Sequence, residues 1–410
     1  MRKINRTKQL LMGLILVIWL IMIAAQWNTL PLSHHADLYH FQLPWWNYLS
    51  EHGFKGIATI NQDINGNYGP IWYFIIVLFN KIGLYPALTV EHCIKLMTSI
   101  LILICSLVAM RIVAINSKDK QHFNDILAFA IVIFSPTLFG DLFKTNLPDS
   151  FYYLFALLAI LSVIKKLDWL GWLFMGVAIS FKAMGMYILP TLFFIYLIRF
   201  NQYKLVNKLA PLFSIIGMFI CAIPGIVFGM KPLEALLGNI ISRSSKTLSI
   251  KFGFWRIFDG QSWIWWPTLN SYQQQQMYGF GLAILAIVFL GLYILIYATK
   301  NESDQYLSLW YLLVLSPLLF WFFLPAQHET YFGLSPLLSS LLFAQFPNRR
   351  NLVILLIANF FIWEGYHGFQ QIFTPITYFY LILLLVAYLI YEIIKLSKIK
   401  RFFLAGPNLG

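Results

Sequence analysis

A polar segment at residues 28–70 gathers carboxylates and imidazoles in a chain that has only 16 acidic residues among its 410. Its titratable residues include His34, His35, Asp37, His40, Glu51, His52 and Asp63. A carboxylate can accept a proton from an attacking hydroxyl group, and imidazoles can bind or orient a polar substrate. Asp37 is the leading candidate for a general base or a substrate anchor.

The spacing around Asp37 also allows two other roles. The residue stands at the start of DLYHFQLPWWNYL, which has the pattern of a helix, and Asp is a favoured N-cap residue. It also lies in a cluster with His34, His35 and His40, whose ligand types suit a metal ion, although the spacing matches no strong motif. A cap can coexist with catalysis, so the sequence leaves base, cap and metal ligand open.

The elements that must position this segment are apolar. The chain is 60% hydrophobic, 18% aromatic and 11% charged, and runs of about 18 or more apolar residues recur. This pattern predicts an all-α polytopic membrane protein, because a β-barrel would show short alternating segments. The formal charge of +13 is explained by Lys and Arg in cytoplasmic loops, so no nucleic-acid partner is expected. Cys93, Cys105 and Cys221 form no CxxC pair, which argues against a disulfide framework or a structural zinc site.

Charged residues at the ends of the apolar runs predict the topology. Four basic residues precede a first span at 9–25, so the N-terminus is expected in the cytoplasm and residues 28–70 outside. The same rule predicts about twelve spans with both termini cytoplasmic. The expected spans are 9–25, 92–113, 125–139, 150–164, 169–181, 185–198 and 209–228, then one ending at Lys300, one over 307–324, one ending at Asn348, one reaching EGYHGFQQ and one ending in KLSKIKRFF.

Two large outer loops divide the predicted chain. An N-terminal membrane module covers 1–229 with a first outer loop at 26–91, a second outer loop covers 230–276, and a C-terminal membrane module covers 277–410. Within the first loop, residues 70–83 are expected to form a helix lying in the membrane interface. The alternative, a short span, would place Arg111, Lys118 and Lys120 outside, against the charge rule.

Other candidate residues fall on the same predicted outer face as Asp37. They are Asp149, Lys182, Arg243 and the His328-Glu329 pair. Each has an alternative role: Asp149 suits the positive end of a helix dipole, the pair suits a solvated turn, and Lys182 suits snorkelling or contact with an anionic head group. Asp141 is a second carboxylate in the short loop before Asp149. A shared face is what one outward-facing site would produce.

These motifs together resemble the GT-C superfamily of membrane glycosyltransferases, whose donors are polyprenyl-phosphate sugars. The resemblance rests on an Asp after the first span in HHADLYHFQLPWWNYLSEHGF, on NYGPIWYF, on LPDSFYYLFALLAILSVIKKLDWLGWLFMGVAISFKAMGMYILP, and on QHETYFGLSPLL. It covers the N-terminal half and one later turn. It implies a GT-C-like fold that is related to the dolichol-pathway mannosyl- and glucosyltransferases.

The resemblance also implies roles for residues. Asp37 would act as the base on the acceptor hydroxyl, Asp149 would support the acceptor or donor sugar, and His328 and Glu329 would contact the donor. His35 and Tyr68 are further substrate-binding candidates. Thr330 stands where a basic residue often follows the His-Glu pair, so neutralisation of the phosphate would fall to residues of the second outer loop. These are Arg243, Lys246 and Arg256.

The expected function is transfer of a hexose, with mannose or glucose favoured, from a polyprenyl-phosphate donor to a hydroxyl group of a glycan, lipid or cell-wall polymer. Inversion is expected, because the hydroxyl attacks opposite the leaving phosphate. No cofactor is expected, and a divalent metal stays an open alternative. The expected location is a bacterial plasma membrane, with membrane lipids around the spans and the site facing outward. The competing functions are a lipid-linked glycan polymerase or ligase, and a transporter or flippase.

Overall fold

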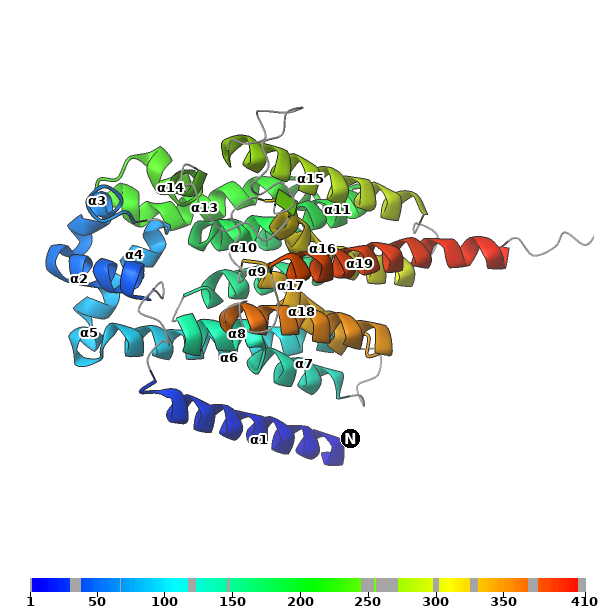
Figure 1. The fold of residues 1–410 in the computed structure, drawn as a ribbon, viewed down its shortest axis with the longest axis horizontal. Coiled ribbons are helices and arrows are strands. Elements are labelled where there is room, and N and C mark those ends of the chain that lie inside the picture. The colour runs from blue at the N-terminus through cyan, green and yellow to red at the C-terminus, as the bar shows by residue number, and fades with distance from the viewer. Residues whose placement is uncertain are drawn as a thin grey trace, which may run out of the picture. The chain divides into compact units, whose positions relative to one another are not determined.

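The protein is an all-α, multi-pass membrane protein. The computed structural model describes residues 2–29, 38–66, 68–116, 123–145, 148–244, 254–255, 272–297, 302–324, 331–367 and 375–404. Helices are the regular secondary structure throughout these residues (Figure 1). Within them, eight helical segments are long and apolar enough to cross a bilayer, which confirms the predicted fold class.

Most helices that pass this length criterion begin and end near a predicted span. These are α1 (Arg2–Gln26), α6 (Val90–Asn116), α11 (Leu189–Arg199) with the short helix before it, α13 (Ala210–Val227), α15 (Tyr272–Tyr297), α16 (Glu302–Phe323) and α19 (Pro375–Leu404). The eighth runs from Asn124 to Lys144. Helices also lie at the other expected spans: α9 (Ser150–Ile164), α10 (Asp168–Phe181), α17 (Leu334–Gln345) and α18 (Arg349–His367).

The span expected at 125–139 is not one continuous α-helix. α7 (Asn124–Ile133) ends before Ser135, and α8 (Pro136–Gly140) begins a new helix that passes into a π-helix at Asp141–Thr145. Pro136 explains the break, because proline lacks the N–H that would continue the helix and its ring clashes with the preceding turn.

The chain forms two compact units. Unit 1 comprises Met1–Met186, Tyr203–Ser245 and Ala344–Pro347, and unit 2 comprises Tyr187–Gln202, Lys246–Phe343 and Asn348–Gly410. The main difference from the predicted modules concerns the segment that holds α11. It was predicted in the N-terminal module but belongs to unit 2, with the C-terminal helices.

Unit 1 is built around close helix packing. α10 and α13 approach at paired glycines: a Cβ on Gly176 would lie 1.9 Å from the Ser214 carbonyl oxygen, and one on Gly217 would lie 2.2 Å from that of Leu173. Small residues at such crossings let helix backbones touch, which is how membrane helices gain packing energy. The same unit contains α9, which packs beside α10.

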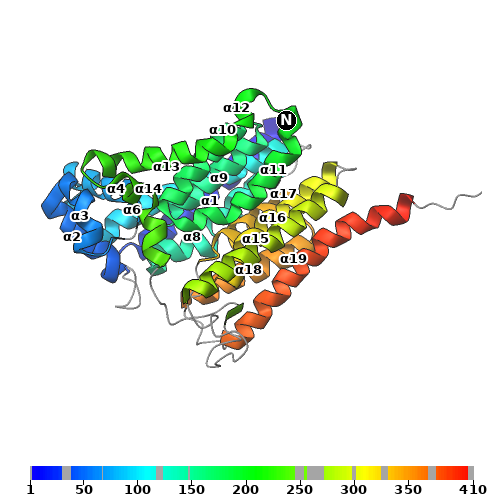
Figure 2. The same cartoon turned by 90° about the horizontal axis from the view of Figure 1, so that it is seen from above.

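Within the segment predicted as the first outer loop, residues 38–66 and 68–87 fold into short helices at one end of unit 1 (Figure 2). They are a π-helix at Leu38–Gln42, α2 (Leu43–His52), α3 (Gly56–Asp63), α4 (Pro70–Lys81) and α5 (Leu84–Ala87). α4 has 12 residues, fewer than the roughly 20 that a span needs, and it begins at Pro70, a residue that suits the first helical position. Its position relative to the membrane stays a prediction.

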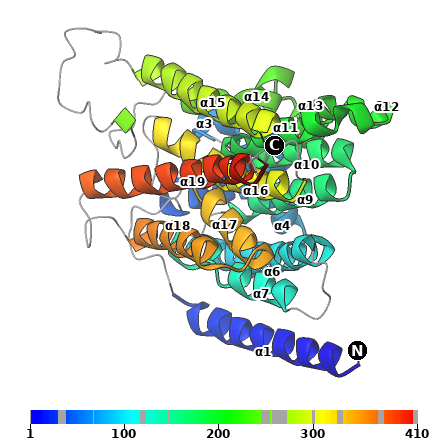
Figure 3. The same ribbon diagram turned by 90° about the vertical axis from the view of Figure 1, so that its right-hand side faces the viewer.

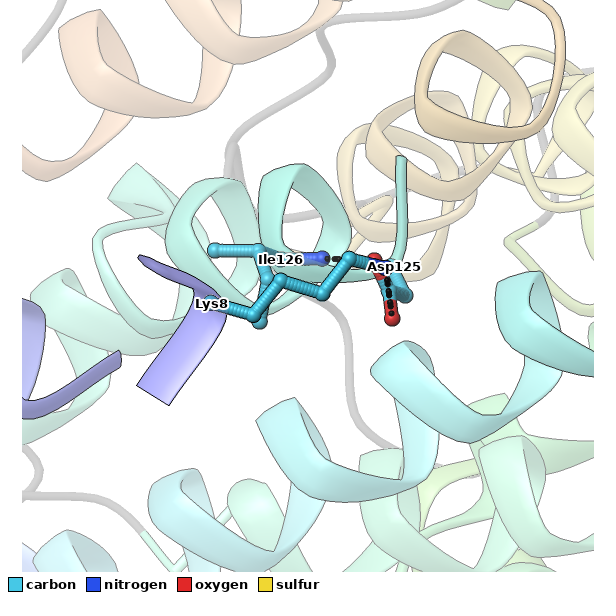
Figure 4. Close-up of polar contacts among 3 residues, drawn as sticks. All are labelled: Lys8, Asp125 and Ile126. Carbon is cyan, nitrogen blue, oxygen red and sulfur yellow. Dashed lines mark hydrogen bonds and ion pairs between the residues drawn. The ribbon is translucent and has the colours of Figure 1, made fainter. Parts of the chain in front are cut away.

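An ion pair joins α1 to α7 (Figure 4). Lys8 Nζ lies 2.9 Å from Asp125 Oδ1 and 3.0 Å from Oδ2, and the backbone N–H of Ile126 donates to Oδ1 at 3.0 Å. Farther along α1, the buried Trp19 ring packs edge-on against Phe134 and Phe143. These contacts hold a helix whose remaining faces are largely exposed apolar surface, as expected for a span that contacts lipid.

Unit 2 is built around α16, which packs against both α15 and α19 (Figure 3). A Cβ on Gly279 of α15 would lie 2.2 Å from the Phe323 carbonyl oxygen, so only glycine fits there. The hydroxyl groups of Ser316 and Thr191 bond to carbonyl oxygens of the facing helices, of Tyr187 and Leu312 respectively. These bonds satisfy hydroxyl groups that would be costly to bury alone.

Candidate functional site

Three of the residues selected from the sequence meet at one buried carboxylate in unit 1. Asp149 precedes the first residue of α9 and Lys182 follows the last residue of α10; only 3% and 5% of their surfaces are exposed. Lys182 Nζ forms a hydrogen-bonded ion pair with Asp149 Oδ2. Tyr68 Oη donates to the other oxygen, Asp149 Oδ1, at 3.3 Å. All three were candidates from the sequence, but their spacing did not predict that Tyr68 and Lys182 both contact Asp149.

Helix geometry favours both charges of this pair. Asp149 lies at the N-terminal end of α9, where the helix dipole stabilises an anion, and Lys182 lies at the C-terminal end of α10, where it stabilises a cation. Asp149 makes no side-chain capping bond to its own helix, so its oxygens are used for Tyr68 and Lys182. Snorkelling would carry the ammonium group to water, whereas Lys182 is buried against Asp149.

Close backbone packing fixes Tyr68 beside this pair. A Cβ on Gly69 would lie 2.1 Å from the carbonyl oxygen of Ser180, near the end of α10. The backbone N–H of Tyr68 donates to Tyr73 Oη at 2.9 Å, and the Trp45 ring meets the Tyr68 ring edge-on at 5.4 Å. Residues 68–70 are therefore held tightly against α10, and Gly69 makes the approach possible.

We expect Gly69→Ala to displace Tyr68 from Asp149. The added methyl group would overlap the Ser180 carbonyl oxygen, which is backbone and cannot rotate away, so we expect a destabilisation of about 1–3 kcal/mol. Gly13→Ala is the matched control, because a Cβ on Gly13 has nothing within 4 Å. Thermal unfolding in detergent measures the difference, and equal melting temperatures for the two variants would contradict this packing.

An aromatic ring and a second buried carboxylate, which the sequence did not bring together, belong to the same part of unit 1. The Lys182 ammonium nitrogen lies 5.8 Å from the centre of the Tyr152 ring, within reach of a cation–π attraction. Asp141, named from the sequence as a second carboxylate, is fully buried on the π-helix that precedes Asp149. Charges enclosed in this way interact more strongly than in water, because the local dielectric is low.

Lys95 is a buried cation that sequence reasoning missed. It lies one turn into α6 with 2% of its surface exposed, and its ammonium group donates to the carbonyl oxygens of Gln26 at 3.1 Å and Trp27 at 2.8 Å, and to that of Thr29. It thus caps the C-terminal end of α1 and is stabilised by that helix dipole. A lysine inside the apolar run EHCIKLMTSI was the available signal.

A separate hydrogen-bond network joins α2 to α3. Tyr48 Oη on α2 bonds to Asp63 Oδ2 and to the hydroxyl group of Thr59, both on α3, and the His52 ring stacks on Tyr48 at 4.2 Å. Partial burial and then the hydrogen bond to Asp63 raise the pKa of the Tyr48 phenol, which keeps it protonated as a donor. The Asp63 carboxylate therefore helps to hold α2 and α3 together.

The side chains of the remaining predicted site residues are not described by the structure. Asp37, His35, His328, Glu329 and Arg256 lie outside the described residues, and the backbone of Arg243 belongs to α14 (Pro232–Ser244). The predicted metal alternative also depends on residues outside this part. Within the described residues, no three His, Cys, Asp or Glu side chains gather closely enough to hold a metal ion.

Comparison with protein-family models and with curated protein sequences finds no match for this chain.

Proposed function

We propose that the protein is an inverting glycosyltransferase with a GT-C-like fold of about twelve spans. Its donor is a polyprenyl-phosphate hexose, mannose or glucose, and its acceptor is a hydroxyl group of a glycan, lipid or cell-wall polymer. The site faces the outer side of a plasma membrane, and both termini are cytoplasmic. The observation that carries this proposal is the convergence of Tyr68, Asp149 and Lys182 at one buried carboxylate.

The convergence supports the proposal for a physical reason. Tyr68 comes from one motif of the resemblance, and Asp149 and Lys182 come from the beginning and the later part of another. A shared site is what joint action on one substrate requires. Sugar transfer needs hydroxyl-binding groups beside the reacting carbon and a cation near the departing phosphate. A tyrosine, a carboxylate and an ammonium group enclosed together supply those types of group.

The proposed reaction is a single displacement. The acceptor oxygen forms a bond to the anomeric carbon while the bond from that carbon to the phosphate oxygen breaks, and the bonding electron pair leaves with polyprenyl phosphate. Asp37 takes the proton of the acceptor hydroxyl group. The developing phosphate charge is met by Lys182 and by arginines of the second outer loop, of which Arg243 and Arg256 are the candidates. Attack from the face opposite the phosphate inverts the anomeric centre.

The positions of buried charges favour this reading over a transporter. In the described residues, the buried charged side chains lie close to the ends of helices or predicted spans. They are Lys95, Asp141, Asp149, Asp168, Lys182, Glu364 and Glu392. Transporters place ionisable groups near the middle of the membrane, where a substrate crosses. Charges near helix ends suit a reaction performed at the membrane surface.

A donor panel tests the proposed activity. The purified full-length protein in lipid vesicles is incubated with radiolabelled polyprenyl-phosphate hexoses, and release of polyprenyl phosphate is followed. We expect turnover with at least one of these donors and none with the matching nucleotide sugars, because the leaving group must be presented from the bilayer. If every lipid-linked donor shows neither turnover nor saturable binding, the proposed class is wrong.

A further inference from the structure

A cavity of about 340 Å³ lies in unit 2, whereas the cluster around Asp149 belongs to unit 1. It is lined by residues at the start of α16, at the start of α18 and toward the C-terminal end of α19. These residues are Leu307, Tyr311, Asn348, Arg349, Arg350 and Leu396. Its volume is at the lower end of the range of about 300–1,000 Å³ that small-molecule sites occupy. The cavity lies within one compact unit.

Most polar side chains that line the cavity already have a hydrogen-bond or ion-pair partner. Tyr311 Oη donates to Asn351 Oδ1 at 2.8 Å, and Asn348 Oδ1 accepts the backbone N–H of Asn351 at 3.0 Å. Arg350 pairs with the buried Glu392 at 3.2 Å, and 49% of its side chain is still exposed. Arg349 has no ion pair among the described residues and is exposed. The two arginines and Glu392 leave the site with net positive charge.

The positive groups border a lining that is mostly apolar. Leu307 and Leu396 are partly exposed, and the Tyr311 ring adds an aromatic surface. A free inorganic anion would gain nothing from leucine side chains. An amphiphile with a phosphate and a hydrocarbon part would use both kinds of surface, since arginine binds phosphate oxygens through paired N–H groups.

We propose that this cavity binds the phosphodiester head group of an anionic phospholipid, with the first part of its acyl chains against Leu307 and Leu396. Arg349 supplies the free guanidinium group, and Arg350, oriented by Glu392, supplies the second. Basic pockets between membrane helices are suited to such head groups. In the proposed topology this end of unit 2 faces the cytoplasm. The site is independent of the sugar-transfer proposal, since no residue is shared.

Native mass spectrometry of the full-length protein in detergent tests the site. Phosphatidylglycerol is titrated beside phosphatidylcholine, and glycerol 3-phosphate is the soluble probe of the same phosphate chemistry. We expect saturable binding of one phosphatidylglycerol, with affinity at least tenfold above phosphatidylcholine and no retention of glycerol 3-phosphate. Equal affinity for the two lipids would overturn the proposal, and binding of glycerol 3-phosphate as tight as that of the lipid would overturn the role of the apolar lining.

Two variants localise the binding. Arg349→Gln removes the Arg349 charge and leaves Arg350 paired with Glu392, and we expect it to lower the affinity for phosphatidylglycerol about tenfold or more. Leu396→Trp narrows the apolar side of the cavity and keeps both arginines. We expect it to lower the affinity for the lipid as well. Lys204→Gln is the matched control, because it removes one exposed positive charge of the same predicted face outside the cavity. If Lys204→Gln weakens binding as much as Arg349→Gln, the lipid responds to general surface charge and the site is wrong.

Discussion

Asp37→Ala is expected to lower turnover of the lipid-linked donor by about 10²- to 10⁴-fold, the usual contribution of a positioned general base. At roughly 1.4 kcal/mol per tenfold change in rate, this loss corresponds to about 3–5 kcal/mol of barrier height. The melting temperature is expected to stay unchanged. Initial rates at saturating donor and acceptor, measured in vesicles, give the change.

The matched control for Asp37→Ala is Glu51→Ala. Glu51 is an exposed carboxylate on α2 in the same outer segment, so its removal tests for a general charge effect. Near-full activity in Asp37→Ala would remove the general-base assignment. If Arg243→Ala or Arg256→Ala then abolished activity, a polymerase or ligase that depends on arginines of the second outer loop would replace it. A lower melting temperature in Asp37→Ala would instead indicate that the residue acts as a helix cap.

The apolar runs made helix positions predictable where charged residues bound them. α9 is the clearest case: its predicted bounds, 150–164, agree with the helix, which lies between Asp149 and Lys165. Its 15 residues place it among the shorter apolar helices, so its crossing of the membrane stays a prediction. The break at Pro136 was not anticipated, although proline in an apolar run was the available signal. The assignment of α11 to unit 2 was not predictable either, because it depends on packing between helices distant in sequence.

The candidate site was predictable in its residue types but not in its geometry. Asp149 and Lys182 were selected separately, from a helix start and from a tight turn. Their pairing depends on the packing of α9 against α10, which residue spacing does not report. Tyr68 joins them only because Gly69 lets its segment touch the backbone of α10. Sequence patterns thus locate residues on elements, and side-chain contacts between elements decide which residues act together.

Breaking the buried pair is expected to destabilise unit 1 by about 3–5 kcal/mol, because removal of one partner leaves a buried charge uncompensated. Asp149→Asn and Lys182→Met each keep side-chain size and remove one charge. Lys8→Met is the matched control, since the Lys8–Asp125 pair has the same residue types but side-chain exposures of 15% and 22%, against 5% and 4% for Lys182 and Asp149. The Lys8–Asp125 pair is only partly buried, so its loss is expected to cost less than the loss of the enclosed pair. Thermal and denaturant unfolding in detergent measure the stability of the three single variants.

The double variant, Asp149→Asn with Lys182→Met, separates a structural role from a functional one. With both charges removed, most of the stability is expected to return, since replacing a whole buried pair is often close to neutral. Donor turnover is expected to stay low, because stability alone does not restore the carboxylate and the ammonium group that the proposed reaction uses. Recovery of both stability and activity would identify the pair as a packing element. A double variant as unstable as the single variants would show that side-chain fit, and not charge, determines the loss.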